Sequence, residues 1–193
     1  MGNHEVEEQL RKDDKTFFGF WVYLMTDLLM FAVLFAAFAV LHNNTFGGPA
    51  AKEIFKLSFV LTETLILLTS SFTTGLAILA IREVNKKMVF VFLGLTFLLG
   101  LVFLGMEFSE FRNLIAEGNS WTRSGFLSSF FTLVGTHGLH IFAGLTWLAL
   151  LLVNLLRKGF THSLTRKLTL FSFFWHFLDI VWIFIFTVVY LMA

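Results

Sequence analysis

The sequence predicts an all-α integral membrane protein built as a bundle of five transmembrane helices. Of its 193 residues, 57% are hydrophobic and only 14% are charged, which is too apolar a composition for a soluble domain of this size. Five apolar runs each reach the roughly 20 residues that a helix needs to cross the hydrocarbon core. These runs are residues 17–41, 57–81, 88–111, 125–157 and 168–192.

The runs divide the chain into a soluble N-terminal tail, residues 1–16, and a single membrane domain, residues 17–193. The tail mixes acidic and basic residues, unlike the cationic start of a signal peptide. Between the first and second runs, Pro49 follows two glycines and predicts a turn. The fourth run is longer than a perpendicular helix requires, so it is expected to tilt or to extend beyond the bilayer.

Basic residues outside the runs predict the orientation, because cytoplasmic loops carry an excess of Lys and Arg. One side of the membrane receives the tail and the second and fourth loops, and the other side receives the first and third. The first side holds Arg11, Lys12, Lys15, Arg82, Lys86, Lys87, Arg157, Lys158, Arg166 and Lys167. The second holds only Lys52, Lys56, Arg112 and Arg123. The N-terminus is therefore expected in the cytoplasm and the C-terminus in the periplasm.

Composition also excludes several classes of function. Cysteine is absent, which removes disulfides, iron–sulfur clusters, thiolate zinc sites and cysteine nucleophiles. The formal net charge of +1 gives no electrostatic reason to expect a nucleic-acid partner.

Eight ionisable residues nevertheless lie inside the apolar runs, where no strong cation accompanies them before Arg157 at a boundary. Five unpaired carboxylates would cost about 15 kcal/mol at roughly 3 kcal/mol each. Some must therefore be protonated, bonded to histidine, or close to the water interface. The eight are Asp27, Glu63, Glu107, Glu110, His137, His140, His176 and Asp179.

Alternating helix directions separate these residues by depth. Glu63, Glu107 and Glu110 are expected near the outer face, where they could guide ions, although a hydrated rim is the favoured interpretation. Asp27 is expected nearer the midplane, either as a proton relay or, in the favoured interpretation, as a protonated acid bonded to a neighbour.

His137, His140, His176 and Asp179 also belong near the midplane. His137 and His140 are three residues apart, as are His176 and Asp179, so the members of each pair share a helix face. The favoured interpretation is a polar packing seam between the fourth and fifth helices. The alternative is a metal site, since two histidines and a carboxylate can form a facial triad for iron.

Motifs in the last three helices resemble the subunit III chains of heme-copper terminal oxidases. They are Glu107-Phe108-Ser109-Glu110, Gly135-Thr136-His137-Gly138-Leu139-His140 and Phe174-Trp175-His176-Phe177-Leu178-Asp179-Ile180-Val181-Trp182. Residues 18–27 and 123–131 are especially similar to subunit III of bacterial cytochrome o ubiquinol oxidase. Five helices also fit this type, because mitochondrial-type members carry seven.

The resemblance implies a role that spacing alone does not. Subunit III carries no redox centre, whereas the hemes and copper lie in subunit I, so no catalytic residue and no metal or other cofactor are expected in this chain. Its implied partners are subunits I, II and IV and membrane phospholipid, in a proton-pumping ubiquinol oxidase of the bacterial inner membrane. It would support assembly, lipid binding and sustained turnover. Asp27 falls where mitochondrial-type relatives carry a membrane-embedded glutamate, which makes it the candidate for a proton-linked role.

Three alternatives remain at this point. The chain could be subunit III of a five-helix bacterial cytochrome c oxidase, because the choice of electron donor resides in other subunits. It could be a stand-alone membrane metalloenzyme that uses the facial-triad residues. An ion transporter is a third class, but the inverted repeats common in transporters are not evident.

Overall fold

The computed structural model describes residues 3–45 and 57–192 and confirms the all-helical fold. Its elements are α1 (Asn3–Leu41), α3 (Leu57–Arg82), α4 (Lys86–Ala116), α5 (Gly125–Lys158), α6 (His162–Ile185) and the π-helical segment η1 (Phe186–Leu191). In the described part of the chain, five helices are long and apolar enough to cross a membrane. The turn predicted at Pro49 lies outside the described residues.

Several helices extend beyond the apolar runs that predict them. α1 begins at Asn3, within the segment predicted as a soluble tail, and α6 begins at His162 instead of residue 168. Helices need not stop at the membrane surface if their first N–H groups find acceptors. Side chains before α4, α5 and α6 supply these acceptors at the third residue of each helix. The pairs are Asn85 with Met88, Ser124 with Leu127, and Thr161 with Leu164.

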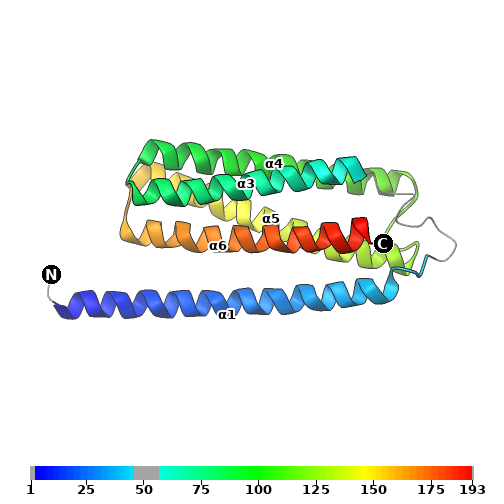
Figure 1. Ribbon diagram of the computed structural model, residues 1–193, viewed down its shortest axis with the longest axis horizontal. Helices are drawn as coiled ribbons and strands as arrows, with labels where there is room; N and C mark the ends of the chain where they lie inside the picture. The colour runs from blue at the N-terminus through cyan, green and yellow to red at the C-terminus, as the bar shows by residue number, and fades with distance from the viewer. Residues whose placement is uncertain (1–2, 46–56, 193) are drawn as a thin grey trace.

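The last four helices form a closed four-helix bundle, in which each helix packs against two neighbours. α3 contacts α4 and α6, and α5 contacts the same two helices from the other side. α1 lies outside this ring, packs on α5 and, less extensively, on α6, and runs parallel to the bundle (Figure 1). α1 starts at the end opposite to the one where η1 stops (Figure 1), as an odd number of spans requires.

Small and hydroxyl-bearing residues bring α3 and α4 together. The Thr96 hydroxyl of α4 lies 2.8 Å from that of Thr73 and 3.2 Å from that of Thr74 on α3. One turn along α4, Gly100 faces the other neighbours of that helix, because a Cβ atom there would be 2.8 Å from Leu145 Cδ2 on α5 and 3.1 Å from the indole ring of Trp175 on α6. Close backbone approach and hydroxyl contacts are how membrane helices associate when burial in lipid gives no hydrophobic drive.

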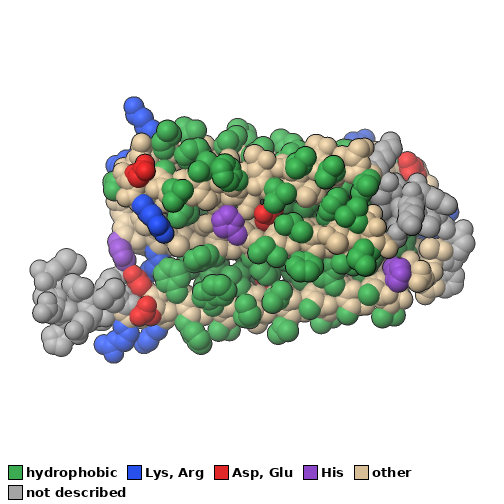
Figure 2. All heavy atoms as spheres, viewed as in Figure 1, with side chains coloured by type: hydrophobic (Ala, Val, Ile, Leu, Met, Phe, Trp, Pro, Cys, Tyr) green, Lys and Arg blue, Asp and Glu red, His purple; other side chains and the backbone are tan. Residues whose placement is uncertain are grey.

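The outer surface is apolar along its length. Figure 2 shows hydrophobic side chains over the middle of one face, with Lys and Arg gathered mainly at the end where α1 begins. In water such a surface would aggregate, whereas in a bilayer it meets lipid or partner helices.

Candidate functional site

A polar cluster of Ser71, His176 and Asp179 joins α3 to α6. The Ser71 hydroxyl lies 2.6 Å from Nδ1 of His176, and Ser71 also interacts with the Asp179 side chain. A serine hydroxyl carries one donor and two acceptor lone pairs, so it can bond to both partners at once. The contact links positions 105 residues apart in the chain and sets the register of α6 against α3.

Two buried tryptophans of α6 reinforce the same interface. Trp175 Nε1 donates a 2.9 Å hydrogen bond to Ser70 Oγ, and Trp182 Nε1 donates a 3.0 Å hydrogen bond to Thr64 Oγ1. The two indoles are seven residues apart and therefore lie on one helix face. Each buried indole N–H is thus satisfied by a hydroxyl on α3.

His137 lies at the centre of the bundle and is fully buried. Its ring stacks on Trp182 at 5.2 Å between centroids and meets the Phe103 ring edge-on at 6.0 Å. Neither ring nitrogen has a hydrogen-bond partner among the described residues. Within the bundle, the contacts of His137 are therefore made by its ring faces and edges.

Asp27 of α1 pairs with His140 of α5 near the middle of the membrane domain. Asp27 Oδ2 lies 3.6 Å from His140 Nε2, while Nδ1 of the same ring lies 2.7 Å from the Thr136 carbonyl oxygen. An Nδ1–H donor to that carbonyl leaves Nε2 as the atom that faces the carboxyl group. The Tyr23 side chain, one turn earlier on α1, also interacts with Asp27. Asp27 and His140 thus join α1 to α5.

The four residues predicted as one seam between the fourth and fifth helices therefore occupy three separate contacts. His140 faces α1, His176 and Asp179 face α3, and only His137 joins α5 to α6. Across the described residues, no group of three or more His, Asp or Glu side chains is placed to hold a metal ion. The facial triad considered from the sequence is thus not assembled by these side chains.

The three glutamates expected at a hydrated rim are more enclosed than predicted. Glu63 is 0% exposed and Glu107 is 3% exposed, whereas Glu110 is half-buried. The rim interpretation is therefore wrong for Glu63 and Glu107, because both side chains are buried between the helices of the four-helix ring.

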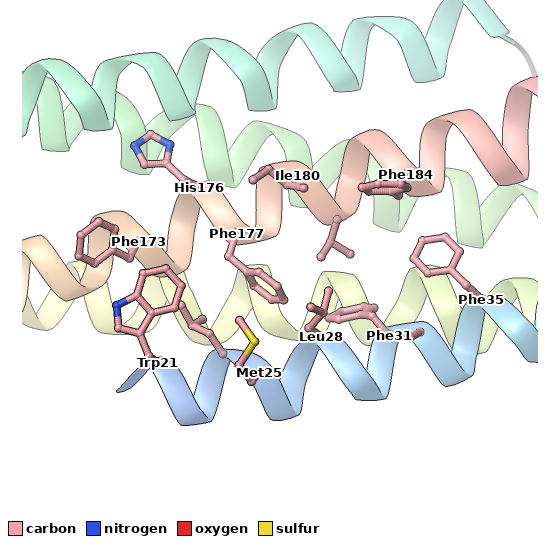
Figure 3. Close-up of a pocket in the computed structure, with 13 residues that line it drawn as sticks. Trp21, Met25, Leu28, Phe31, Phe35, Phe173, His176, Phe177, Ile180 and Phe184 are labelled. Carbon is pink, nitrogen blue, oxygen red and sulfur yellow. The ribbon is translucent and has the colours of Figure 1, made fainter. Parts of the chain in front are cut away.

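An apolar groove of about 440 Å³ runs between α1 and α6. Figure 3 shows Met25, Leu28 and Phe31 opposite Phe177, whereas the His176 ring points toward α3 and away from α1. The groove thus offers a ligand almost no polar atom. Its walls are Trp21, Leu24, Met25, Leu28, Phe31, Ala32, Phe35, Phe173, His176, Phe177, Ile180, Val181 and Phe184.

Contacts near both ends of α1 attach it to the rest of the bundle. Near the start of the membrane span, Asp13 forms an ion pair with Arg166 of α6 and lies 3.5 Å from Nε2 of His162. At the other end, the Phe126 N–H donates to the Asn44 carbonyl oxygen over 3.3 Å. α1 is therefore fixed at its two ends and, through Asp27, at its middle.

Sequence reasoning missed the hydroxyl partners on α3, which carry most of the polar contacts across the bundle. The signal was present as a hydroxyl-rich stretch inside an apolar run, namely Thr62, Thr64, Thr69, Ser70, Ser71, Thr73 and Thr74. Such residues form interhelical hydrogen bonds in membrane proteins. Five of the seven are buried against neighbouring helices.

Comparison with known proteins assigns this architecture to a family. The family model described as cytochrome c oxidase subunit III matches residues 2–193 of the chain. The chain belongs to this family. Its members are subunit III chains of heme-copper oxidase complexes, which supports the resemblance seen in the motifs of α4, α5 and α6.

Three relatives illustrate the range of this similarity. Cytochrome bo(3) ubiquinol oxidase subunit 3 of Pseudomonas aeruginosa is 53% identical over 98% of this chain and 91% of that protein. Cytochrome c oxidase subunit 3 of Bacillus sp. strain PS3 is 44% identical over 92% of this chain and 86% of its own length. Quinol oxidase subunit 3 of Bacillus subtilis is 42% identical over 99% of this chain and 94% of its own length. The similarity therefore covers whole subunits.

Proposed function

We propose that the chain is the accessory, non-redox subunit III of a proton-pumping ubiquinol oxidase in the bacterial inner membrane. In this role it packs beside a heme-bearing subunit I, together with subunits II and IV, and the oxidation of ubiquinol and reduction of oxygen take place in its neighbours. The observation that carries the proposal is the 53% identity, over nearly the whole chain, to a ubiquinol oxidase subunit.

The internal contacts support a scaffold more than a catalyst. Ser71, Trp175 and Trp182 use their polar atoms to bond helix to helix, and the groove beside them is apolar. A catalytic cleft would instead present convergent polar groups to a substrate. The contacts fix the relative positions of α3 and α6, which is what a subunit that stabilises a partner requires.

The orientation within the membrane forms part of the same proposal. We infer a cytoplasmic N-terminus, because the end of the bundle where α1 begins carries most of the Lys and Arg residues (Figure 2). In this orientation Asp13 and Arg166 lie at the cytoplasmic end, and Glu63, Glu107 and Glu110 lie toward the periplasm.

The groove between α1 and α6 is proposed to bind a phospholipid through one of its acyl chains. From Trp21 to Phe35 the groove follows α1 for about 21 Å, given a rise of 1.5 Å per residue. That length lies along the membrane normal and covers much of a hydrocarbon core about 30 Å thick. Because the walls are apolar and His176 points away (Figure 3), they match an alkyl chain better than a polar head group.

Asp27 is proposed to take part in proton-linked chemistry as an auxiliary group. It lies midway along the span from Asp13 to Leu41, is 8% exposed, and pairs with His140. A carboxyl group and an imidazole at 3.6 Å can share or pass a proton with little movement. The pair lies beside the lipid groove, since Leu24 and Leu28 line it on either side of Asp27.

The identity of the electron donor is tested on the complex that is purified through an affinity tag on this chain. Oxygen consumption should be rapid with ubiquinol and absent with reduced cytochrome c. The alternative, a cytochrome c oxidase, is favoured by the relative from Bacillus sp. strain PS3. A dinuclear copper centre in the co-purifying subunit II, with turnover on cytochrome c, would establish that alternative and overturn the ubiquinol assignment.

Lipid binding is tested with a matched pair of substitutions on α1. Ala32 lines the groove, whereas Ala37 is exposed on the same helix outside it. Ala32→Trp should fill the groove and reduce the phospholipid retained by the complex, as measured by native mass spectrometry, while Ala37→Trp should leave it unchanged. Equal lipid content in the two variants would show that the groove is not the binding site.

A further inference from the structure

Three glutamates lie close together in the proposed periplasmic half of the bundle. Glu63 comes from α3, and Glu107 and Glu110 come from α4, and each interacts electrostatically with the other two. Lys and Arg residues in the described ranges form no ion pair with them. Arg112, the nearest in sequence, lines a separate groove with Trp121.

The other helices of the ring close the site around these carboxyl groups. On α5, Gly138 makes room for Glu107, because a Cβ atom at Gly138 would lie 2.5 Å from Glu107 Oε1. On η1, the Tyr190 hydroxyl donates a 2.9 Å hydrogen bond to Glu110 Oε2 and interacts electrostatically with all three glutamates. Every helix of the four-helix ring thus takes part in the site.

The π-helical turn of η1 brings Tyr190 into this position. In an uninterrupted α-helix, Tyr190 would be rotated by about 80° from Trp182, given 3.6 residues per turn. The wider π turn reduces that rotation, so Tyr190 faces the bundle and its ring lies 6.4 Å from the ring of Trp182. π segments within α-helices occur frequently at functional sites.

Two of the glutamates have no hydrogen-bond partner among the described residues, whereas the third, Glu110, bonds to Tyr190. Both carboxyl oxygens of Glu63 and of Glu107 are buried without a hydrogen-bond partner among the described residues. His137, which precedes Gly138, is also fully buried with both ring nitrogens unpartnered. Buried polar atoms with no partner, on three of the four helices, indicate that the site holds something besides these side chains.

Protons are the ligand that fits this chemistry. An ionised carboxylate needs a cation or several donors when it leaves water, and Glu63 and Glu107 have neither among the described residues. Adjacent carboxyl groups cannot all be ionised, and they share protons as a coupled set. A protonated acid is also a donor, which allows the carboxyl groups to bond to one another or to a water between them.

We propose that Glu63, Glu107 and Glu110 form a buried proton-binding site, in which Glu63 and Glu107 hold protons and Glu110 exchanges them with the periplasmic surface. Glu110 suits the exchange role because it is half-buried and accepts the Tyr190 hydrogen bond as a carboxylate does. The site is separate from the Asp27–His140 pair, which joins α1 to α5, and it does not depend on the electron donor of the complex.

Infrared spectroscopy of the purified complex tests the protonation states. The wild-type spectrum minus that of Glu63→Gln, or of Glu107→Gln, should contain the carbonyl band of a protonated carboxylic acid. The matched control is Glu117→Gln, at an exposed position just after α4, which should remove only carboxylate bands. Because Gln is a neutral isostere, both buried variants should also stay assembled with near wild-type thermal stability. If Glu63→Gln and Glu107→Gln instead lose carboxylate bands relative to the wild type, a cation site would replace the proposed proton site. The same conclusion would follow if the thermal stability of the wild-type complex required Na⁺ or K⁺.

The exchange role of Glu110 is tested by transferring the complex into D₂O. The deuterium shift of the protonated-acid band should be several-fold slower in Glu110→Gln than in the wild type. Tyr190→Phe, which keeps all three carboxyl groups, provides a second variant in case Glu110→Gln fails to assemble, and it should also slow the shift. Exchange at the wild-type rate in either assembled variant would contradict the assigned route.

Discussion

Replacing Gly144 with alanine tests the close packing of α5 against α6 most sharply. A Cβ atom at Gly144 would lie 2.9 Å from Trp175 Cζ3 and 3.1 Å from Phe174 Cε1. These are atoms of rigid rings, and Trp175 is held by its hydrogen bond to Ser70. Gly135 on the same helix is the matched control, because its nearest neighbour would be 3.6 Å away, an ordinary contact.

The expected magnitude follows from the displacement that the new methyl group forces. The Trp175 ring must move by about 0.6 Å to reach an atom separation of roughly 3.5 Å, which strains its bond to Ser70. Overpacking costs about 1–3 kcal/mol, against a gain of about 1 kcal/mol from replacing glycine in a helix. Gly144→Ala should therefore destabilise the subunit by up to about 2 kcal/mol, whereas Gly135→Ala should be neutral or slightly stabilising.

The assay is the temperature at which this chain dissociates from the purified complex, measured by size exclusion after heating. Gly144→Ala should dissociate at a lower temperature than the wild type, and Gly135→Ala should not. If the two variants dissociate at the same temperature, then Trp175 is free to move and the α5–α6 interface is not fixed as described.

Three further substitutions address the polar contacts. Asp27→Asn should leave assembly and heme content intact and reduce turnover or proton pumping only in part; complete loss of oxygen reduction in the assembled complex would show a central role. Asp179→Leu should weaken the packing of α6 on α3 by about 1 kcal/mol. Ser71→Ala should weaken it more strongly, because Ser71 contacts both His176 and Asp179. Unchanged thermal stability in Ser71→Ala would contradict the contact. Arg166→Ala should release the start of α1 and increase proteolysis there, whereas Lys167→Ala, an exposed neighbour, should not; equal cleavage would show that the Asp13 pair does not hold α1.

The five helices could be predicted from the sequence because hydropathy and length alone decide whether a segment crosses a bilayer. The helix ends were harder, since α4 and α6 continue past the apolar residues. The capping residues Asn85 and Thr161 were visible signals for those ends. The spans and the starts of α4 and α6 were thus readable locally, without knowledge of the neighbouring helices.

The partners of the buried polar residues could not be predicted in the same way. Spacing correctly places His176 and Asp179 on one face, but it does not say which helix that face meets. The rotation and depth of α6 turn that face toward Ser71, and those of α5 turn His140 toward Asp27. The π segment that redirects Tyr190 likewise depends on packing at the end of α6 and leaves no periodic signal in the sequence.

The central claim is that this chain supports a catalytic neighbour and carries no redox centre itself. It is tested most directly by purifying the complex through a tag on this chain, dissociating it, and measuring heme, copper, iron and zinc in each separated subunit. A heme-bearing partner with many membrane spans should co-purify, and the separated chain should retain none of these groups. Stoichiometric metal or heme on this chain, or recovery of the chain without a heme-bearing partner, would contradict it.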